Sequence, residues 1–462
     1  MFRIPLILLL SFNSIDAQRL DLSARAILAS NPRVHWGIHA VQLKTGRVLF
    51  THNADQFFVP ASNAKLFSTA FALTALGAEH RFSTRVLSTA GPDAQGTVAG
   101  DLILLGGGDP SLSSRRYPYD RAQPFAENRL SPLRELARQL KDRGVLYIAG
   151  SIVGDDSLYE FKPVPNGWSA DDGVFEYGAP VSALTFNDNS FSLRAGAAGI
   201  AIEPPVEYFT ILNEIRGDAA LDRRVIADRQ PGSRVIRLSG NLPPAAKEYT
   251  NEFAVEDPAL YAAISFRQVL IEEGIRVDGS AAARHLAPSA PETVELARRD
   301  SPPLQQLLQV VDKESQNLHA ELMLRAAKQK MPVAGFLQLA GIDEKDLNLE
   351  DGSGMSRLNL ICPRAVVKLL SFIAARGQLE LFRDFLPTGT EDGTLRNRFS
   401  KSAQGKLIRA KTGTLSHVAA LGGYAESKRY GTIAFQIVAN NFNAPSQEVR
   451  AAIDRIALAL LQ

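Results

Sequence analysis

The feature that most constrains the fold is a change of pattern between about Arg81 and about Leu296. Here the chain consists of short strand-like apolar runs separated by Gly, Pro, Asn and Asp. Helical periodicity returns within this stretch at Ser131–Arg143 and at Pro258–Gly274. The pattern is typical of an inserted β-rich region. We therefore expect one domain built from both ends of the chain and split by an insertion of roughly two hundred residues, a size that fits one or two domains.

A Pro-rich passage from Ala287 to Pro291, followed by Ser301-Pro302-Pro303, marks the end of the insertion. We place the first part of the core domain at 18–84, the insertion at 85–296 and the second part at 297–462. Periodicity predicts two groups of elements. The helices are Asp21–Ala29, Leu304–Val311, Gln316–Lys330, Pro363–Arg376 and Ser446–Leu461. The strands are Val34–Leu43, Arg47–His52, Leu102–Leu105, Tyr147–Ala149, Ser182–Leu193, Val235–Leu238, Leu407–Thr414, Val418–Ala425 and Gly431–Asn440.

The N-terminal residues predict a secretory signal over 1–17. Arg3 precedes a short apolar run that ends at Phe12, and Ala17 is a plausible cleavage point. A buried N-terminal strand or helix is the alternative. The chain has 51 Lys and Arg against 49 Asp and Glu, so charge gives no support to a nucleic-acid partner. We expect an exported protein of the periplasm or cell envelope, and a peripheral contact with the membrane surface is left open.

Ser62 and Lys65 lie three residues apart at the start of an expected helix. Pro60 precedes them, and Gly77 marks the end of the helical pattern. The helix is indicated by apolar residues at helical intervals, namely Leu66, Ala70, Leu73 and Leu76. Residues three apart share one helix face, so a hydroxyl and an amine would lie one turn apart near the positive end of the helix dipole. This arrangement can produce a serine nucleophile with a lysine base.

Lys-Thr-Gly occurs twice, in two different contexts. Lys44-Thr45-Gly46 joins two strand-like runs, where the glycine supplies a positive φ and the lysine faces water, so this copy predicts a hairpin turn. Lys411-Thr412-Gly413 continues a run that begins at Leu407 and extends into Thr414, so this copy predicts a strand of a sheet. Gly413 would let another group approach that strand closely.

Ser-x-Asn occurs three times, and one copy opens an expected helix. The copies at 11–13 and 239–241 fall in the expected signal and in a loop before two prolines. At Ser315-Gln316-Asn317 both side chains can point into a cleft, although helix capping by Ser315 is an equally good local explanation. With the Ser62 and Lys411 motifs, this element completes the signature of penicillin-binding proteins and related β-lactamases.

The chain resembles the serine peptidase family S13, the class C low-molecular-mass penicillin-binding proteins of the D-alanyl-D-alanine carboxypeptidase/endopeptidase type. The resemblance covers nearly the whole chain after the signal. Its motifs, in order, are Pro60–Leu66, Gly106–Pro110, Tyr177–Leu184 with Asn187–Asn189, Ser301–Leu304, Lys313–Asn317 with Ala320-Glu321, Asp351–Arg357 and Arg409–Leu415. The resemblance implies a mixed α/β fold: a β-lactamase/transpeptidase-like core with an antiparallel sheet flanked by helices, and a mostly β insertion of one or two domains.

The resemblance also implies a role for each motif residue. Ser62 would be the nucleophile and Lys65 the general base, made neutral by burial and by the nearby charge of Lys411. Ser315 would relay the proton to the leaving amine, and Asn317 would bind the substrate amide and hold Lys65. Thr412 and Thr414, with Lys411, would receive the terminal carboxylate. The backbone amides of Ser62 and Thr414 would hold the oxyanion, and Gly413 is the third substrate-binding residue.

The expected function is that of a serine DD-peptidase that cleaves D-Ala-D-Ala termini, cross-links, or both, in peptidoglycan stem peptides. β-Lactams would act as inhibitors, and neither a metal nor a cofactor is implied. Which bond is preferred, and the oligomeric state, stay open. One alternative is a β-lactamase or esterase of the same fold, which would be distinguished by fast turnover of the β-lactam adduct. The other is a non-catalytic wall-binding protein. Such a protein would have no need of all five catalytic residues, which are Ser62, Lys65, Ser315, Asn317 and Lys411.

Four further residues have weaker functional interpretations. His417 follows the Lys411 motif and is an alternative general base, although a lysine-based system is already complete. Cys362 is the only cysteine and precedes Pro363, where a buried or capping role is expected. Asp171 and Asp172 lie in a segment that could contact the diamino acid of the stem peptide, and a plain surface loop is an equally good interpretation.

Overall fold

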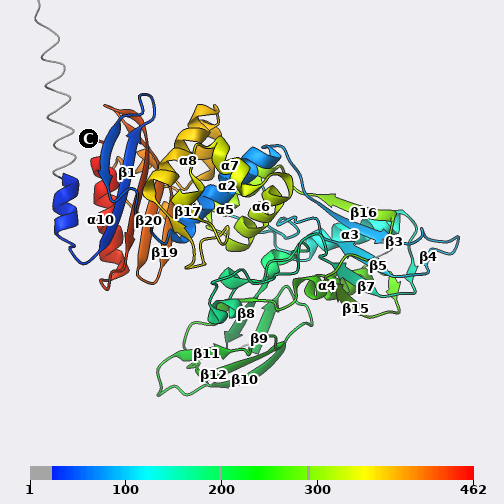
Figure 1. The fold of residues 1–462 in the computed structure, drawn as a ribbon. Helices are drawn as coiled ribbons and strands as arrows, with labels where there is room; N and C mark the ends of the chain where they lie inside the picture. Colours follow the sequence, from blue (N-terminus) through cyan, green and yellow to red (C-terminus); the bar gives the residue numbers. More distant parts are fainter. Residues whose placement is uncertain (1–22, 197–198, 289–291) are drawn as a thin grey trace, which may run out of the picture. The chain divides into compact units, whose positions relative to one another are not determined.

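The computed structural model describes residues 23–196, 199–288 and 292–462, so the expected signal over 1–17 lies outside the described residues. The chain forms two compact units (Figure 1). One contains the residues before Glu79 together with Leu308–Gln462, and the other is Glu79–Leu307. Within the described ranges, no helix has both the length and the apolar character that crossing a membrane requires.

The unit made from both chain ends contains most of the long helices and the longest strands. Its elements are β1 (His35–Gln42), β2 (Val48–His52), η1 (Ala61–Ala64), α2 (Lys65–Leu76), α5 (Leu304–Lys313, which begins just before this unit), α6 (Asn317–Lys330), α7 (Val333–Leu339), η5 (Glu344–Asp346), β17 (Leu347–Asn348), β18 (Leu360–Ile361), α8 (Pro363–Ala375), α9 (Leu379–Phe385), η6 (Gly393–Leu395), η7 (Gly405–Leu407), β19 (Ile408–Leu415), β20 (Val418–Ser427), β21 (Gly431–Asn440) and α10 (Ser446–Ala459).

A five-stranded antiparallel sheet lies at the centre of this unit, with strand order β19-β20-β21-β1-β2. The two ends of the chain meet where β1 pairs with β21, with His35 opposite Asn440. Helix α10 packs on one face of the sheet, and α8 with α2 lies on the other (Figure 1). Buried apolar residues such as Trp36 and Ile453 fill the α10 side. Strand β19 lies at one edge of this sheet, where Arg409 forms an isolated bridge with Thr388.

The inserted unit combines short strands with two well-formed helices. Its elements are β3 (Ser83–Ser88), β4 (Thr97–Val98), β5 (Leu102–Leu105), α3 (Ser131–Asp142), β6 (Tyr147–Ile148), β7 (Ile152–Asp155), η2 (Ala170–Val174), η3 (Glu176–Gly178), η4 (Asn187–Asn189), β8 (Ser190–Gly196), β9 (Gly199–Glu203), β10 (Thr210–Arg216), β11 (Arg224–Asp228), β12 (Val235–Asn241), β13 (Tyr249–Ala254), α4 (Pro258–Glu272), β14 (Arg276–Val277), β15 (Ala281–Arg284) and β16 (Val294–Asp300).

Four small sheets make up the strand content of the described part of this unit. Their orders are β15-β7-β5-β3-β16, β10-β12-β11, β13-β8-β9 and β14-β6-β4. The expected strand Ser182–Leu193 is partly wrong, because β8 begins only at Ser190. The residues before it, Asn187–Asn189, all have positive φ values of 50–54°. Left-handed residues cannot continue an extended strand, and Asn and Asp tolerate this conformation better than most residues.

The Gly106–Pro110 run forms a loop directly after β5. A Cβ atom on Gly106 would lie 2.4 Å from the carbonyl oxygen of Ala183, and one on Gly107 would lie 2.1 Å from that of Ser83. These residues are therefore glycines because other backbone segments pass too close for a side chain.

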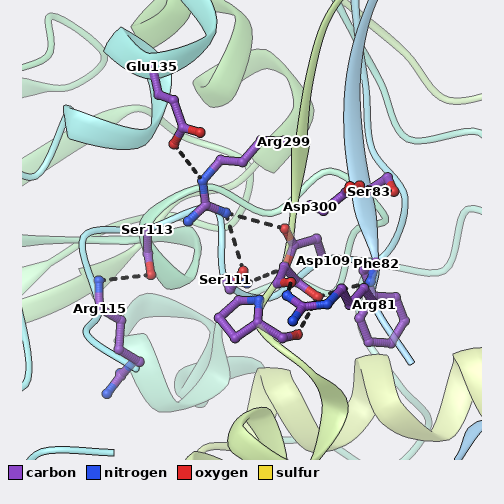
Figure 2. Close-up of polar contacts among 12 residues, drawn as sticks. Arg81, Phe82, Ser83, Asp109, Ser111, Ser113, Arg115, Glu135, Arg299 and Asp300 are labelled. Atoms are coloured by element: carbon purple, nitrogen blue, oxygen red, sulfur yellow. Dashed lines mark hydrogen bonds and ion pairs between the residues drawn. The ribbon is translucent and has the colours of Figure 1, made fainter. Parts of the chain in front are cut away.

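Figure 2 shows how Arg299 of β16 contacts this loop and helix α3. The Nε atom of Arg299 lies 3.3 Å from a carboxylate oxygen of Glu135, and Nη1 lies 3.5 Å from one of Asp109. Nη1 also donates to the hydroxyl of Ser111 at 3.3 Å, while Asp109 accepts the backbone N–H of Ser111 at 2.7 Å. Charged and polar groups thus connect three segments that are far apart in sequence.

Candidate active site

Ser62 lies in the short 3-10 turn η1, which leads directly into α2. Ala61, which precedes it, has a positive φ of 48°. The predicted helix begins at Lys65 and ends where Gly77 adopts a φ of 86°. The prediction that Ser62 and Lys65 share one face is confirmed, because Nζ of Lys65 lies 3.0 Å from Oγ of Ser62. The two residues therefore form a hydroxyl–amine pair at hydrogen-bonding distance.

The side chain of Lys65 is completely buried and makes three polar contacts. Besides Ser62, its Nζ lies 2.6 Å from Oδ1 of Asn317 and 2.6 Å from the carbonyl oxygen of Ser353. Burial, together with the positive charge of Lys411, lowers the pKa of Lys65 to about 7, against the opposing effect of nearby carboxylates. A substantial fraction of Lys65 is therefore neutral at neutral pH.

The geometry around Lys65 assigns its lone pair. A neutral amine has two N–H donors and one acceptor lone pair. Oδ1 of Asn317 and the carbonyl oxygen of Ser353 can only accept, so they take the two N–H groups. The lone pair is left for the hydroxyl of Ser62, which can then donate to it. This is the hydrogen-bond direction that a general base requires.

Two buried carboxylates hold the loop that contains Ser353. Oε1 of Glu321 accepts the backbone N–H groups of Gly352 and Ser353 at 2.7 and 2.8 Å. Asp351 accepts the hydroxyl of Ser353 at 2.8 Å and the backbone N–H of Gly354 at 2.9 Å. Burial, together with the charge of Asp351, raises the pKa of Glu321 to about 7. The carbonyl oxygen that contacts Lys65 therefore has a fixed position.

Ser315 and Asn317 lie at the junction between α5 and α6. Ser315 has a positive φ of 61°, which ends α5 and turns the chain before Asn317 begins α6. The expectation that this element opens a helix is confirmed. The helix is capped by Gln316, whose side chain accepts the backbone N–H of His319, so Ser315 is not the capping residue. Its hydroxyl is left for the site.

Lys411 lies on the edge strand β19 and is completely buried. Its Nζ donates to the hydroxyl of Ser315 at 2.8 Å and to the carbonyl oxygen of Thr412 at 3.0 Å. Burial lowers the pKa of Lys411, while the buried carboxylate of Asp312 opposes this shift. Burial likewise raises the pKa of Asp312, and the positive charges of Lys411 and Lys65 oppose that shift. Asp312 is thus the buried counter-charge of the lysine pair.

Gly413 permits β19 to pass close to the turn that carries Ser62. A Cβ atom at this position would lie 2.7 Å from the carbonyl oxygen of Pro60 and 3.2 Å from Cβ of Ala61. The prediction that Gly413 allows a close approach is therefore confirmed. Any side chain here would push Ser62 away from the strand.

A cavity of about 270 Å³ lies over these residues. It is lined by Ser62, Ser315, Thr394, Arg398, Thr412, Thr414 and Arg450. The hydroxyl of Thr412 donates to that of Thr394 at 2.8 Å. The structure thus brings together Ser62, Ser315, Thr412 and Thr414 around one space, with Lys65 and Lys411 buried behind them and Asn317 in contact with Lys65.

The sequence analysis missed Thr394, Arg398 and Arg450 as residues of the site. Thr394 lies in η6, directly after Asp392, which forms an ion pair with Lys313. A carboxylate oxygen of Asp392 also accepts the backbone N–H of Thr388 at 2.7 Å. No spacing rule connects these residues to Ser62, because they come from different elements.

Several residues with weaker interpretations lie elsewhere. Lys44 lies in the turn between β1 and β2, as predicted. The Nδ1 atom of His417 hydrogen-bonds to the carbonyl oxygen of Phe442 at 2.7 Å, and His417 does not line the cavity beside Ser62. Cys362 is buried directly before α8, as expected, but makes no side-chain cap. Asp171 and Asp172 lie in η2 of the inserted unit.

Comparison with known proteins identifies relatives that match most of this chain over most of their own length. A D-alanyl-D-alanine carboxypeptidase from Actinomadura sp. (strain R39) is 30% identical over 92% of this chain and 81% of the relative. D-alanyl-D-alanine carboxypeptidase DacB from Haemophilus influenzae is 27% identical over 89% of this chain and 86% of the relative. The crystal structure of penicillin binding protein 4 (dacB) from Haemophilus influenzae matches with a TM-score of 0.80 and 26% identity, over 95% of this chain and 98% of that one.

The mixed α/β fold with an antiparallel sheet flanked by helices is confirmed by this similarity. The family match extends over residues 21–460. The chain belongs to the D-Ala-D-Ala carboxypeptidase 3 (S13) family of serine-type carboxypeptidases.

Proposed function

We propose that the chain is an exported serine DD-peptidase that forms an acyl-enzyme on Ser62. The observation that carries this proposal is the 3.0 Å contact between Oγ of Ser62 and Nζ of Lys65, a lysine whose pKa is lowered to about 7. A serine hydroxyl needs an adjacent base to attack a carbonyl at neutral pH. The neutral Lys65, with its lone pair directed at Ser62, supplies that base.

In the acylation step, Oγ of Ser62 attacks the carbonyl carbon between the last two D-alanines while Lys65 takes the hydroxyl proton. The oxyanion of the tetrahedral intermediate accepts hydrogen bonds from the backbone N–H groups of Ser62 and Thr414. The C–N bond then breaks, and the leaving amine receives the proton by way of Ser315. The contact of Ser315 with Lys411 at 2.8 Å supports this relay, because Lys411 can orient the hydroxyl.

The terminal carboxylate of the substrate binds beside Lys411. The hydroxyls of Thr412 and Thr414 face the same cavity as Ser62, and a carboxylate accepts hydrogen bonds from such donors. Thr394 extends this group of hydroxyls through its contact with Thr412. Asn317 holds Lys65 and can bind the amide of the scissile segment with the rest of its carboxamide.

In the second step, water attacks the ester on Ser62 and releases the shortened peptide. A β-lactam places its own amide in the same position and leaves an ester on Ser62 that water removes slowly. The relative from Haemophilus influenzae has also been solved in complex with a β-lactam, and that structure matches with a TM-score of 0.75. We therefore expect β-lactams to inhibit this chain.

The substrate is a peptidoglycan stem peptide, and the protein acts in the periplasm or cell envelope. The signal predicted over 1–17 supports export. Membership of the D-Ala-D-Ala carboxypeptidase 3 (S13) family supports a stem peptide as the substrate. The insertion predicted at 85–296 contains Asp171 and Asp172, which are candidate contacts for the diamino acid of the stem peptide.

Intact-protein mass spectrometry after incubation with benzylpenicillin tests the proposal. We expect a long-lived adduct on the wild-type chain and none on Ser62→Ala. A Ser68→Ala variant is the matched control, because Ser68 is buried in the same helix but bonds only backbone carbonyl oxygens. Rapid loss of the adduct with hydrolysis of the drug would identify a β-lactamase instead. No adduct on a folded wild-type chain would favour a non-catalytic wall-binding protein.

A further inference from the structure

The turn that carries Ser62 contains a strained residue. Ala61, directly before Ser62, has a φ of 48°, a left-handed value that residues with a side chain rarely adopt. The turn is also closely packed, because a Cβ atom on Gly354 would lie 1.9 Å from the carbonyl oxygen of Ala61. Strained backbone of this kind persists only where the surrounding structure fixes it. The contacts on either side of Ala61 therefore decide where the hydroxyl of Ser62 lies.

Before the strained residue, Asn440 of β21 binds Val59 as a neighbouring strand would. Its Oδ1 accepts the backbone N–H of Val59 at 2.8 Å, and its Nδ2 donates to the carbonyl oxygen of Val59 at 3.1 Å. Nδ2 also donates to the carbonyl oxygen of Ala439 at 3.0 Å, which fixes the rotation of the carboxamide. Asn440 is only 5% exposed, so water competes little for these hydrogen bonds. Val59 is thereby tied to the central sheet.

After the strained residue, Gln436 of β21 holds the residue that follows Ser62. Its Oε1 accepts Nδ2 of Asn63 at 2.9 Å, and both side chains are buried. The two amides meet over Gly422 of β20, which pairs with Gln436. A Cβ atom on Gly422 would lie 2.0 Å from Oε1 of Gln436 and 2.9 Å from Nδ2 of Asn63. Glycine therefore leaves the space that this contact needs.

The contact between Asn63 and Gln436 is costly for stability. Oδ1 of Asn63 is buried and has no hydrogen-bond partner among the described residues. A buried acceptor without a partner loses the hydrogen bonds that water would give it, whereas two apolar side chains of similar shape would avoid this loss. Stability alone therefore does not explain a pair of amides at this position, but a role in holding the turn does.

We propose that Gln436 and Asn440 are positioning residues for the acylation of Ser62. They lie four residues apart on β21, so both side chains leave the same face of the sheet, and each holds one end of the Ser62 turn. Neither is among the described residues that line the cavity beside Ser62. The inference rests on the proposed function, in which Ser62 is the nucleophile, and adds two residues that act only through the position of its hydroxyl.

The main test replaces both amides of the buried pair by apolar side chains, Asn63→Leu together with Gln436→Met. The double variant leaves neither amide without its partner, so its midpoint of denaturant unfolding should equal or exceed that of the wild type. Acylation by benzylpenicillin should nevertheless be about tenfold slower, because the turn is no longer held. On a pentapeptide that ends in D-Ala-D-Ala, kcat should fall by a similar factor with little change in KM.

The pH profile separates positioning from a change in the base. The contacts of Lys65 with Asn317 and Ser353 do not involve β21, so acylation of the double variant should rise through the same pKa of about 7 to a lower plateau. A midpoint that moves while the plateau stays the same would overturn the inference. Gln42→Met is the matched control and should leave acylation unchanged, because the amide of Gln42 bonds Tyr430 and Thr45 rather than the Ser62 turn.

Asn440→Leu tests the other end of the turn and is the second variant should the double variant fold poorly. It should also slow acylation about tenfold at an unchanged pH midpoint. Wild-type acylation in either folded variant would overturn the inference, as would a loss that follows stability in the single variants Asn63→Leu and Gln436→Met and disappears in the double variant. A wild type that is not acylated contradicts the proposed function itself, whereas an acylated wild type with unaffected variants contradicts only the positioning role.

Discussion

The Nζ atom of Lys65 donates a 2.6 Å hydrogen bond to the carbonyl oxygen of Ser353, a residue that lies 288 positions further along the chain. This contact and the one to Asn317 take both N–H groups of a neutral lysine. The basicity of Lys65 and the direction of its lone pair therefore depend on residues from three separate parts of the sequence.

The acylation rate should depend on pH through Lys65. Only the neutral lysine can accept the proton of Ser62, and the neutral fraction rises with pH, so kcat/KM should increase through a pKa of about 7 and then level off. The carboxylate of Asp312 raises the pKa of both Lys65 and Lys411. Asp312→Asn should therefore shift the acid limb of the profile to lower pH. The pH profile of acylation by benzylpenicillin measures this, and a shift to higher pH contradicts the assignment.

Glu321 should make the protein less stable as the pH rises. Its pKa is raised from 4.5 to about 7 in the folded chain, so between these values the folded state holds a proton that the unfolded state has lost. This stabilisation is complete below pH 4.5 and is lost as the pH rises through about 7. Gln keeps the acceptor oxygen for Gly352 and Ser353 without the titration. Relative to the wild type, Glu321→Gln should therefore gain about 1.4 kcal/mol of unfolding free energy per pH unit in that range.

Denaturant unfolding of both proteins at several pH values measures this difference. Glu350→Gln is a useful control, because it removes a carboxylate one residue before Asp351 while Glu321 still accepts the backbone N–H groups of Gly352 and Ser353. A difference between Glu321→Gln and the wild type that stays constant with pH would mean that Glu321 does not titrate in this range.

Gly413→Ala should abolish most activity while the fold is retained. The added methyl group would lie 2.7 Å from the carbonyl oxygen of Pro60, so the turn that carries Ser62 must move. We expect acylation to fall about a hundredfold, because small displacements of reacting groups have effects of this size. Gly335→Ala in α7 is the control: its methyl group meets only Cγ of Met331 at 3.8 Å, and alanine favours a helix. Similar acylation rates for the two variants would contradict the prediction.

Asp392 should increase the activity by holding Ser315 and Thr394 in position. Its ion pair with Lys313 joins the loop before η6 to the end of α5, two residues before Ser315. Asp392→Asn keeps an acceptor for Thr388 but loses the ion pair, and we expect kcat to fall about tenfold with a smaller change in KM. Asp384→Asn is the control, because Asp384 is exposed and its carboxylate accepts a hydrogen bond from the side chain of Gln309. Equal effects of the two substitutions would show that the ion pair has no positioning role.

The sequence alone determined the features that depend on near neighbours in the chain. The turn at Lys44–Gly46 and the helix that places Lys65 beside Ser62 follow from glycine, proline and periodicity, and both are present. Strand β21 has the bounds predicted for it, because its nearly continuous apolar run, which begins after Gly431 and ends at Asn440, is a local signal. Where local signals conflicted, the prediction was wrong: the apolar run from Ser182 contains Asn187–Asn189, whose left-handed backbone delays β8 to Ser190.

Only the tertiary structure decided which distant residues complete the site. The motif residues Ser315 and Lys411 were predicted individually, but their 2.8 Å contact depends on the pairing of sheet and helices. The carboxylates of Asp312 and Glu321 control pKa values because the fold removes them from water, and burial of a charge cannot be inferred from spacing. Arg398 and Arg450 reach the cavity from separate elements. Local sequence specifies backbone conformation, whereas proximity, burial and electrostatic coupling arise only when the whole chain packs.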